Sequence, residues 1–560
     1  MFQAYQTNSM RQRGKVKRFC LSFVLVLAAC FFLLCLIFFL FPLITSLNTV
    51  FFAKNKDEVV GYLLFSQVVK VFLFTIYHTF FSSLLAVVLG LLLAFFCANR
   101  RFAFKNFLLS FSAIPFTLPP LILVLSYLLF FGNNGFFFSL LKEVFNLNIS
   151  SFLYSIAGIV IVQGMYNFPI AMQEITESWQ RVPKNEIEAA TLLQASPFFI
   201  FRTLTLPHIL PSIISSFLLI FLFCFFSFVI VLMFGGVGVS TIEVELYKCA
   251  LHSGNANNIA TFFLIEFSFA LMLVVLHNYA NKKCEIEGKD ASNIEVKKMS
   301  KIESVIFFLL VLIVIFFLIL PLISIFLFSF KSNKSFSAFS LSHQIFFKFS
   351  FQTWKHIFSS SLFWRSFFSS MYIGVLTTIV SILATIFYIF CKLFIVKNKW
   401  IDIFPFLPLA TSSIMLGAGW NFIMPNVSYN VGVVMLICCQ SSLFYPFAVA
   451  KLNIAVKNAV TENLIDASIL LSQSRVKTFF FVVLPLVSKS LLSASAIIFA
   501  MSIADASLPL VLGIERFSNL ALLLFDYASS YRFAESAAIG TFLLFMSMPV
   551  FLFQKTMKKY

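Results

Sequence analysis

The chain has 560 residues, of which 60% are hydrophobic and only 11% are charged, and its formal net charge is +18. A soluble domain carries roughly a quarter charged residues, and a disordered chain is polar and poor in aromatic residues, so both classes are excluded. The apolar runs last about 20 residues, roughly twice the length of a strand in a membrane barrel. The sequence therefore predicts an all-α polytopic membrane protein.

Twelve apolar segments are long enough to cross a bilayer, which takes about 20 residues of helix. The first of them is too long for the apolar core of a cleavable signal peptide, and no small-residue cleavage site follows it. We therefore expect about 12 transmembrane helices. They are predicted at 19–46, 76–98, 107–131, 152–175, 210–233, 258–280, 303–330, 367–394, 401–422, 431–453, 487–511 and 534–553.

Basic residues gather at the two ends of the chain and in alternate loops. Loops rich in Lys and Arg face the cytoplasm in membrane proteins, so both termini are predicted to be cytoplasmic. The predicted outer loop 331–366 is also basic and is an exception to this pattern. The residues that set the orientation are Arg11, Arg13, Lys15, Lys17, Arg18, Arg100, Arg101, Lys105, Arg181, Lys184, Arg202, Lys392, Lys397, Lys399, Lys555, Lys558 and Lys559.

One strongly polar stretch, residues 281–302, separates two groups of six predicted spans. It carries charges of both signs and is too short to hold a core of its own, so we interpret it as a cytoplasmic linker. The expected organisation is a basic tail at 1–18, a first half at 19–280, the linker at 281–302, a second half at 303–553 and a tail at 554–560.

The two halves resemble each other in sequence. Pro207 and Pro485 lie 278 positions apart, each after a leucine, and at the same offset Gly235 matches Gly513. Because each half has an even number of predicted spans, both enter the membrane in the same orientation. The sequence therefore predicts a parallel repeat related by an axis along the membrane normal.

The loop after the fourth span and the loop after the tenth share a pattern. Glu188 and Asp466 each stand 19 positions before the proline of a Leu-Pro pair, and small residues follow both acids. An early acid suits the positive end of a helix dipole, and Leu192 and Leu193 add an apolar side. The alternative interpretation is an ordinary amphipathic interhelical loop, which two copies at equal spacing disfavour.

This pattern resembles the EAA loop in the membrane subunits of ABC importers, which reads EAA, three residues, Gly, nine residues, Ile, one residue, Leu-Pro. The first copy matches the triplet in full and the second matches it loosely. Neither copy has the family's glycine, which leaves the usual turn geometry open. The resemblance implies that 186–197 and 464–474 dock against ATP-hydrolysing subunits. The residues implied are Glu186, Glu188, Ala189, Ala190, Gln194, Pro207, Asp466, Ala467, Ser468, Ser472 and Pro485.

Two further stretches resemble the permeases of thiamine importers, namely 235–247 and the region from Leu522 to Arg532. Ferric-iron permeases share the architecture and remain the alternative. The resemblance implies two fused type-1 permease units, with cores at about 75–278 and 363–553. It also implies two ABC ATPase copies at the cytoplasmic face, an extracytoplasmic binding protein and a location in the bacterial inner membrane, among lipid.

Two acids lie inside predicted spans, where a charge costs at least roughly 2.5 kcal/mol. Glu266 lies about a third of the way into the sixth span, and Asp505 lies in the outer third of the eleventh, with Ser227 as its repeat counterpart. We hypothesise that they line the translocation path and attract a cationic substrate. The alternative is an interhelical hydrogen bond that fixes packing.

No phosphate-binding loop, catalytic cluster or metal-ligand pattern is visible in the sequence. We therefore expect no enzyme activity, cofactor or metal in this chain, and ATP hydrolysis on separate subunits. The excess of Lys and Arg over Asp and Glu is explained by membrane orientation, so no nucleic-acid partner is expected. The remaining rival is an ion-coupled secondary transporter with twelve spans, which would not need the paired loops.

Overall fold

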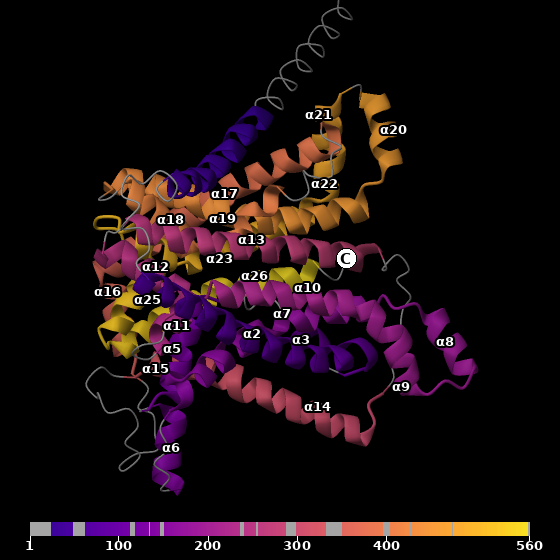
Figure 1. Ribbon diagram of the computed structural model, residues 1–560, viewed down its shortest axis with the longest axis horizontal. Coiled ribbons are helices and arrows are strands. Elements are labelled where there is room, and N and C mark those ends of the chain that lie inside the picture. Colours follow the sequence, from indigo (N-terminus) through magenta and orange to yellow (C-terminus); the bar gives the residue numbers. More distant parts are fainter. Residues whose placement is uncertain are drawn as a thin grey trace, which may run out of the picture.

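The computed structural model describes residues 24–48, 62–102, 104–111, 118–133, 135–145, 151–235, 240–253, 256–286, 298–331, 350–395, 404–424, 427–472 and 474–557. Long apolar helices run side by side across the molecule (Figure 1). No β-strand occurs in these ranges. The prediction of an all-α polytopic membrane protein is confirmed, because each helix satisfies its own backbone hydrogen bonds as a lipid environment requires.

The first half begins with the helix Val24–Asn48 and ends with α13. Its helices are α2 (Tyr62–Asn99), α3 (Lys105–Ser110), α5 (Pro120–Phe131), α6 (Phe136–Phe145), α7 (Ile156–Trp179), α8 (Lys184–Leu192), α9 (Pro197–Ile200), α10 (Leu206–Phe225), α11 (Phe228–Phe234), α12 (Ile242–Lys248) and α13 (Ala256–Ile286).

The second half begins with α14, whose start is fixed by a reciprocal cap between Ser300 and Glu303. Its helices are α14 (Lys301–Val314), α15 (Leu320–Phe328), α16 (Gln352–Ser359), α17 (Ser361–Phe394), α18 (Ser413–Ile423), α19 (Tyr429–Ala459), α20 (Glu462–Ser472), α21 (Arg475–Thr478), α22 (Leu484–Leu486), α23 (Ser488–Ala504), α24 (Ser507–Leu512), α25 (Leu520–Ser529) and α26 (Phe533–Met557).

Nine of the described helices are long and apolar enough to span a membrane, or up to eleven if each of two bent pairs counts as one span. The predicted total of twelve is therefore not confirmed. The predicted span 210–233 is divided, since α10 ends at Phe225 and α11 begins at Phe228. The predicted span 487–511 is divided in the same way at Asp505, between α23 and α24.

The helix Val24–Asn48 packs against the second half of the chain. The Trp420 indole Nε1 donates to the Phe38 carbonyl at 2.9 Å, and the rings of Phe38 and Trp420 stack with centroids 4.7 Å apart. Further along, the Ser442 hydroxyl donates to the Cys35 carbonyl at 2.9 Å. The first span of the first half is thus held by α18 and α19.

The first span of the second half packs against the first half in return. The Tyr127 hydroxyl of α5 donates to the carbonyl of Phe317, and the rings of Phe131 and Phe317 stack at 5.6 Å. At the other end of this span, Arg100 and Glu303 form an ion pair, with Arg100 Nε 2.9 Å from a Glu303 oxygen. The first span of each half therefore packs against the other half, and the two halves interlock.

Candidate docking helices and the cavity between the halves

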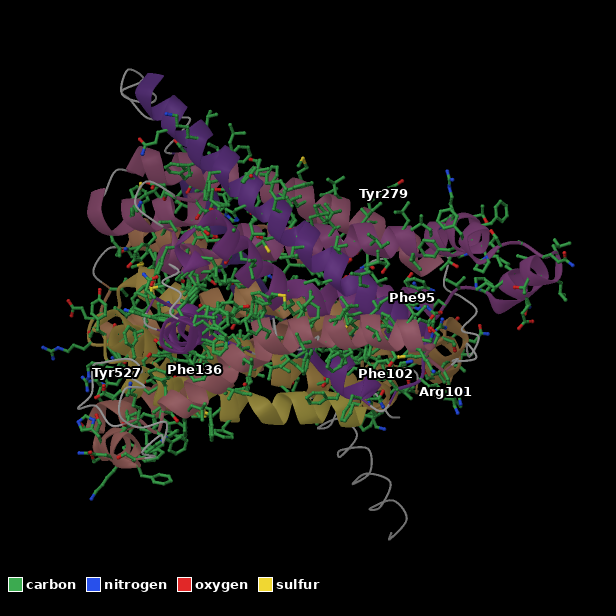
Figure 2. The ribbon with its side chains drawn as sticks, turned by 90° about the horizontal axis from the view of Figure 1, so that it is seen from below. Phe95, Arg101, Phe102, Phe136, Tyr279 and Tyr527 are labelled. Atoms are coloured by element: carbon green, nitrogen blue, oxygen red, sulfur yellow. The ribbon has the colours of Figure 1, made fainter. Side chains whose placement is uncertain are left out.

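Two short helical hairpins extend beyond the ends of the long helices at one end of the molecule (Figure 1). The first hairpin is α8 followed by α9, and the second is α20 followed by α21. Arg101 and Phe102 lie at this same end, whereas Phe136 and Tyr527 lie at the opposite end (Figure 2). The two loops that the sequence singled out thus project from one face of the protein.

The two hairpins are built from the same elements at the same spacing. Helices α8 and α20 begin at Lys184 and Glu462, 278 residues apart. Helices α9 and α21 begin at Pro197 and Arg475, again 278 apart. Each of the latter is preceded by a capping serine, since Ser196 and Ser474 accept hydrogen bonds from the N–H groups of Phe199 and Lys477.

A single turn of π-helix joins each hairpin to the next span. These turns are Phe201–Thr205 and Phe479–Val483, and the Leu-Pro pair follows each of them. Pro207 and Pro485 both occupy the beginning of a helix, where a missing N–H is tolerated. Beyond this point the halves differ: α10 continues to Phe225, whereas the second copy bends by 73° between α22 and α23.

Each hairpin carries two adjacent leucines that are exposed. The exposed fractions are 84% and 83% for Leu192 and Leu193, and 79% and 89% for Leu470 and Leu471. Full burial of one leucine side chain is worth about 1.5–3 kcal/mol. Such a pair at the tip of a projecting helix leaves an apolar surface uncovered, and the repeat presents it twice.

The predicted docking residues surround these leucines. Glu186, Glu188 and Asp466 are exposed, and none of them forms an ion pair within the described part of the chain. Ala189 and Ala467 are exposed, while Ala190 and Ser468 are half-buried. This surface therefore combines exposed carboxylates with small side chains.

Gln194, which replaces the family's glycine in the first copy, adopts a left-handed backbone conformation with φ 58°. The Ala195 N–H donates to the Ala190 carbonyl at 3.1 Å across this residue, and the Gln194 N–H donates to the Thr191 carbonyl at 3.0 Å. These bonds close the end of α8 in the manner usually made by glycine. The end of α8 therefore adopts a left-handed turn although glycine is absent.

Ser472, the counterpart of Gln194, stabilises the turn after α20 with side-chain hydrogen bonds. The Ser474 N–H donates to the Ser472 hydroxyl at 3.3 Å, and the Ser472 and Thr478 hydroxyl oxygens lie 2.9 Å apart. Gln473 lies outside the described residues, so the backbone of this turn is not compared with that of the first copy. The two hairpins thus reach similar shapes by different local bonds.

A cavity of about 160 Å³ lies between the two halves. Residues of both contribute to its wall, and phenylalanines predominate: Phe223, Phe226, Phe228, Phe444 and Phe447. Among the described lining residues the only charged side chain is Glu243, on α12. The cavity wall thus combines aromatic rings with one carboxyl group and the hydroxyl groups of Thr411, Ser412, Ser413 and Ser507.

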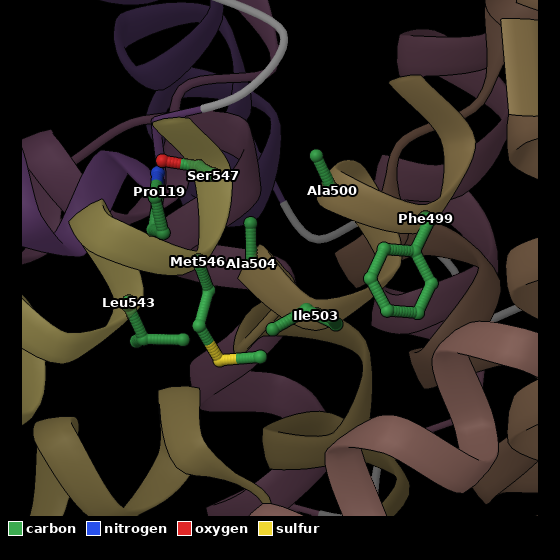
Figure 3. Close-up of a pocket in the computed structure, with 8 residues that line it drawn as sticks. All are labelled: Pro119, Phe499, Ala500, Ile503, Ala504, Leu543, Met546 and Ser547. Atoms are coloured by element: carbon green, nitrogen blue, oxygen red, sulfur yellow. The ribbon is translucent and has the colours of Figure 1, made fainter. Parts of the chain in front are cut away.

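A second small pocket, between α23 and α26, differs in kind (Figure 3). It has room for only about 10 Å³, roughly one water molecule, and its wall is almost wholly apolar. Leu543 and Met546 of α26 lie beside Ile503 and Ala504 of α23 (Figure 3). It is a packing gap and offers no place for a substrate.

Glu266 is fully buried on α13 and belongs to the same region as Glu243. The two carboxyl groups lie within reach of each other and of the Ser412 hydroxyl, which comes from the second half. Ser412 also accepts a hydrogen bond from the Met415 N–H at 2.9 Å, at the start of α18. The sequence predicted Glu266 as a site residue but did not place Glu243 beside it.

Asp505 and Ser227 occupy equivalent breaks, after α23 and after α10. One Asp505 oxygen accepts from the Ser507 N–H at 3.0 Å and so caps α24. The other accepts from the Gln440 side chain at 3.1 Å. Ser227 precedes α11 without making such a cap. Neither lines the cavity directly, although their neighbours Phe226, Phe228 and Ser507 do.

Comparison with known proteins identifies this architecture. Residues 86–277 match the family of binding-protein-dependent transport system inner membrane components. The chain is 25% identical to the thiamine transport system permease protein of Haemophilus influenzae, over 86% of this chain and 88% of that protein. It is 22% identical to the corresponding protein of Brucella abortus, over 84% of each chain.

A third relative, the ferric transport system permease protein of Actinobacillus pleuropneumoniae, is 22% identical over 93% of this chain and 76% of that protein. The chain is therefore similar to the permeases of ABC importers over most of its length. Its long apolar helices and these relatives indicate a multi-pass inner-membrane protein, and the relatives are transport subunits rather than enzymes.

Glu243 is the site residue that sequence reasoning missed. It stands in Thr241-Ile242-Glu243-Val244-Glu245, where two acids two positions apart look like one solvated stretch. In the structure, Glu245 pairs with Lys248 at 2.9 Å while Glu243 is buried against the other half. The apolar residues on either side of Glu243 were the one available signal, because they place it on the buried face of a short helix.

Proposed function

We propose that the protein is a permease, the membrane subunit of an ATP-driven importer, and that it works by alternating access. The observation that carries this proposal is the repeated hairpin, with its exposed leucine pair, at one end of both halves (Figure 1). A secondary transporter has no use for two such contact points. Two ATPase subunits, one on each hairpin, would move the interlocked halves relative to each other.

The orientation follows from the same proposal. The hairpins face the cytoplasm, where ATP is available, and both termini lie on that side. The basic residues near the hairpins agree with this orientation, since Arg101 lies at that end (Figure 2) and Arg475 begins α21 of the second hairpin. A binding protein would then deliver substrate to the opposite face, near α16 and α25.

The proposed substrate is thiamine, and the translocation path is the region of Glu266, Asp505 and Ser227. The names of the Haemophilus and Brucella relatives support this choice. The aromatic cavity supports it as well, because aromatic faces attract organic cations. Ferric iron is the second candidate, supported by the name of the Actinobacillus relative.

The test is uptake by the whole transporter in proteoliposomes, with ATP inside and the substrate-loaded binding protein outside. The proposal expects accumulation of thiamine that requires ATP and survives an uncoupler. Accumulation of ferric ion instead would change the proposed substrate from thiamine to ferric iron and leave the ATP-driven mechanism unchanged. Uptake that continues without ATP and collapses with an uncoupler would overturn the ATP-driven mechanism.

A further inference from the structure

The carboxyl pair of Glu243 and Glu266 is not explained by the packing of the protein. Both side chains are buried, at 1% and 0% exposure, and their four oxygens receive no well-formed hydrogen bond from the described residues. None of the described Lys, Arg or His side chains forms an ion pair with them. Burying two acids beside each other without a cation is costly.

The position of the pair suggests a ligand. Glu243 is one of the residues that line the cavity between the halves, and its carboxyl oxygens are buried there without a well-formed hydrogen bond. The two acids come from α12 and α13 of the first half, whereas Ser412 comes from the second half. A ligand held here would touch both of the bodies that alternating access has to move.

The rest of the cavity wall restricts the kind of ligand. Phe223, Phe226 and Phe228 of the first half and Phe444 and Phe447 of the second line the same space, and the ring centroids of Phe223 and Phe447 lie 6.4 Å apart. Aromatic faces attract a diffuse organic cation, and a carboxylate supplies its counter-charge. A neutral molecule would leave the acids uncompensated.

A bare trivalent metal ion fits this cavity poorly. The described residues contain no group of three or more His, Cys, Asp or Glu side chains that could hold a metal. Two carboxylates in an apolar space would leave part of the charge of such an ion without a partner. The wall therefore favours a monovalent cation with a flat ring.

We propose that Glu243, Glu266 and Ser412 form the recognition site for the positive charge of an organic monocation, whose ring lies among the phenylalanines between the two halves. This inference rests on the proposed function and adds to it the residues that select substrate by charge. The pair would favour a cationic heterocycle over a neutral molecule of the same shape.

The test measures equilibrium binding to the full-length permease in lipid nanodiscs. The probes are thiamine, a neutral isostere with carbon in place of the thiazolium nitrogen, and ferric citrate. The wild-type protein should bind thiamine at least tenfold more tightly than the isostere. Glu243→Gln and Glu266→Gln should each weaken thiamine binding at least tenfold and leave the isostere unchanged. The matched control is Glu245→Gln, on the same helix but paired with Lys248.

Three outcomes would overturn the inference. These are unchanged preference for thiamine in Glu243→Gln, absence of any preference in the wild-type protein, and iron binding that is lost in Glu243→Gln. If Glu243→Gln is poorly folded, Glu243→Asp provides the measurement, since it keeps the charge and should retain the preference. Failure of the proposed function shows separately, as absence of ATP-driven thiamine uptake by the wild-type transporter.

Discussion

Gln194 adopts a left-handed conformation at a position where the resembling family has glycine. The left-handed region costs a non-glycine residue roughly 1–2 kcal/mol, yet Gln194 occupies it because bonds on both sides close the end of α8. The sequence showed the missing glycine but not the bonds that compensate for its loss, which depend on the coordinates of the whole turn.

Changes at Gln194 should follow the preferences of a left-handed residue. Gln194→Val is expected to destabilise the hairpin by about 1–2 kcal/mol, because a β-branched side chain is strained there. Gln194→Gly should be tolerated. Limited proteolysis of the segment 181–206 measures the difference, and equal cleavage rates for the valine and wild-type proteins would contradict it.

Asp505 makes an interhelical hydrogen bond, which was the expected alternative to a path-lining role, together with a helix cap that the sequence did not indicate. It caps α24 and binds Gln440, whose side-chain oxygen accepts from the Ser502 hydroxyl at 2.6 Å. A path-lining role for Asp505 stays a proposal beside this one. The two roles predict different outcomes for the same substitutions.

Asp505→Asn keeps an oxygen that can cap α24, whereas Asp505→Ala removes it. The alanine variant should lose about 1–2 kcal/mol of stability, measured as a lower midpoint of thermal unfolding in detergent. The asparagine variant should retain most of the wild-type stability. If the charge also serves transport, the asparagine variant will be stable but slow in uptake; equal stability of the alanine variant and the wild type would contradict the capping role.

At the scale of elements, much of the docking region could be predicted from the sequence. The equal spacing of Glu188 and Asp466 before their prolines indicated a repeated helical segment, and the structure has one at each place. The hydropathy pattern also located most of the long helices. It could not show the breaks at Ser227 and Asp505, because an apolar run continues across both.

The exposed leucines predict how much ATPase affinity depends on the hairpins. Leu192→Ala with Leu193→Ala should weaken ATPase binding at least tenfold, because about 1–2 kcal/mol of apolar burial is lost with each side chain. Leu470→Ala with Leu471→Ala should have a similar effect at the second hairpin. Binding of the purified ATPase to the permease in nanodiscs gives the measurement.

A suitable control is Leu309→Ala, which changes an exposed leucine on α14 away from both hairpins. It should leave ATPase affinity unchanged. Undiminished affinity in both leucine-pair variants would show that the hairpin tips are not the contact points.

At the scale of the whole molecule, the exchange of first spans is the feature that the sequence could not indicate. Hydropathy sets the length of a membrane helix but carries no information about its neighbour. The bonds of Trp420 to Phe38 and of Tyr127 to Phe317 join segments hundreds of residues apart. Glu243 was missed for a related reason, since its burial depends on contact with the opposite half.

The interlock predicts how the chain behaves when divided. Residues 1–290 and 291–560, expressed together, should assemble and co-purify, because each carries a span that the other needs. Expressed alone, 291–560 should be degraded or aggregate, since Trp420 and Ser442 lose their partners on the N-terminal helix. Two pieces that each accumulate as stable, separate proteins would contradict the interlocked packing.

The central claim is that ATP hydrolysis drives transport through the hairpins, and Glu188→Arg tests it most directly. The measurement is ATPase activity stimulated by loaded binding protein, together with substrate uptake, in proteoliposomes that contain the whole transporter. The account predicts that the variant is inserted and folded as the wild type is but loses both stimulated hydrolysis and uptake. Normal stimulation and uptake in Glu188→Arg would contradict it.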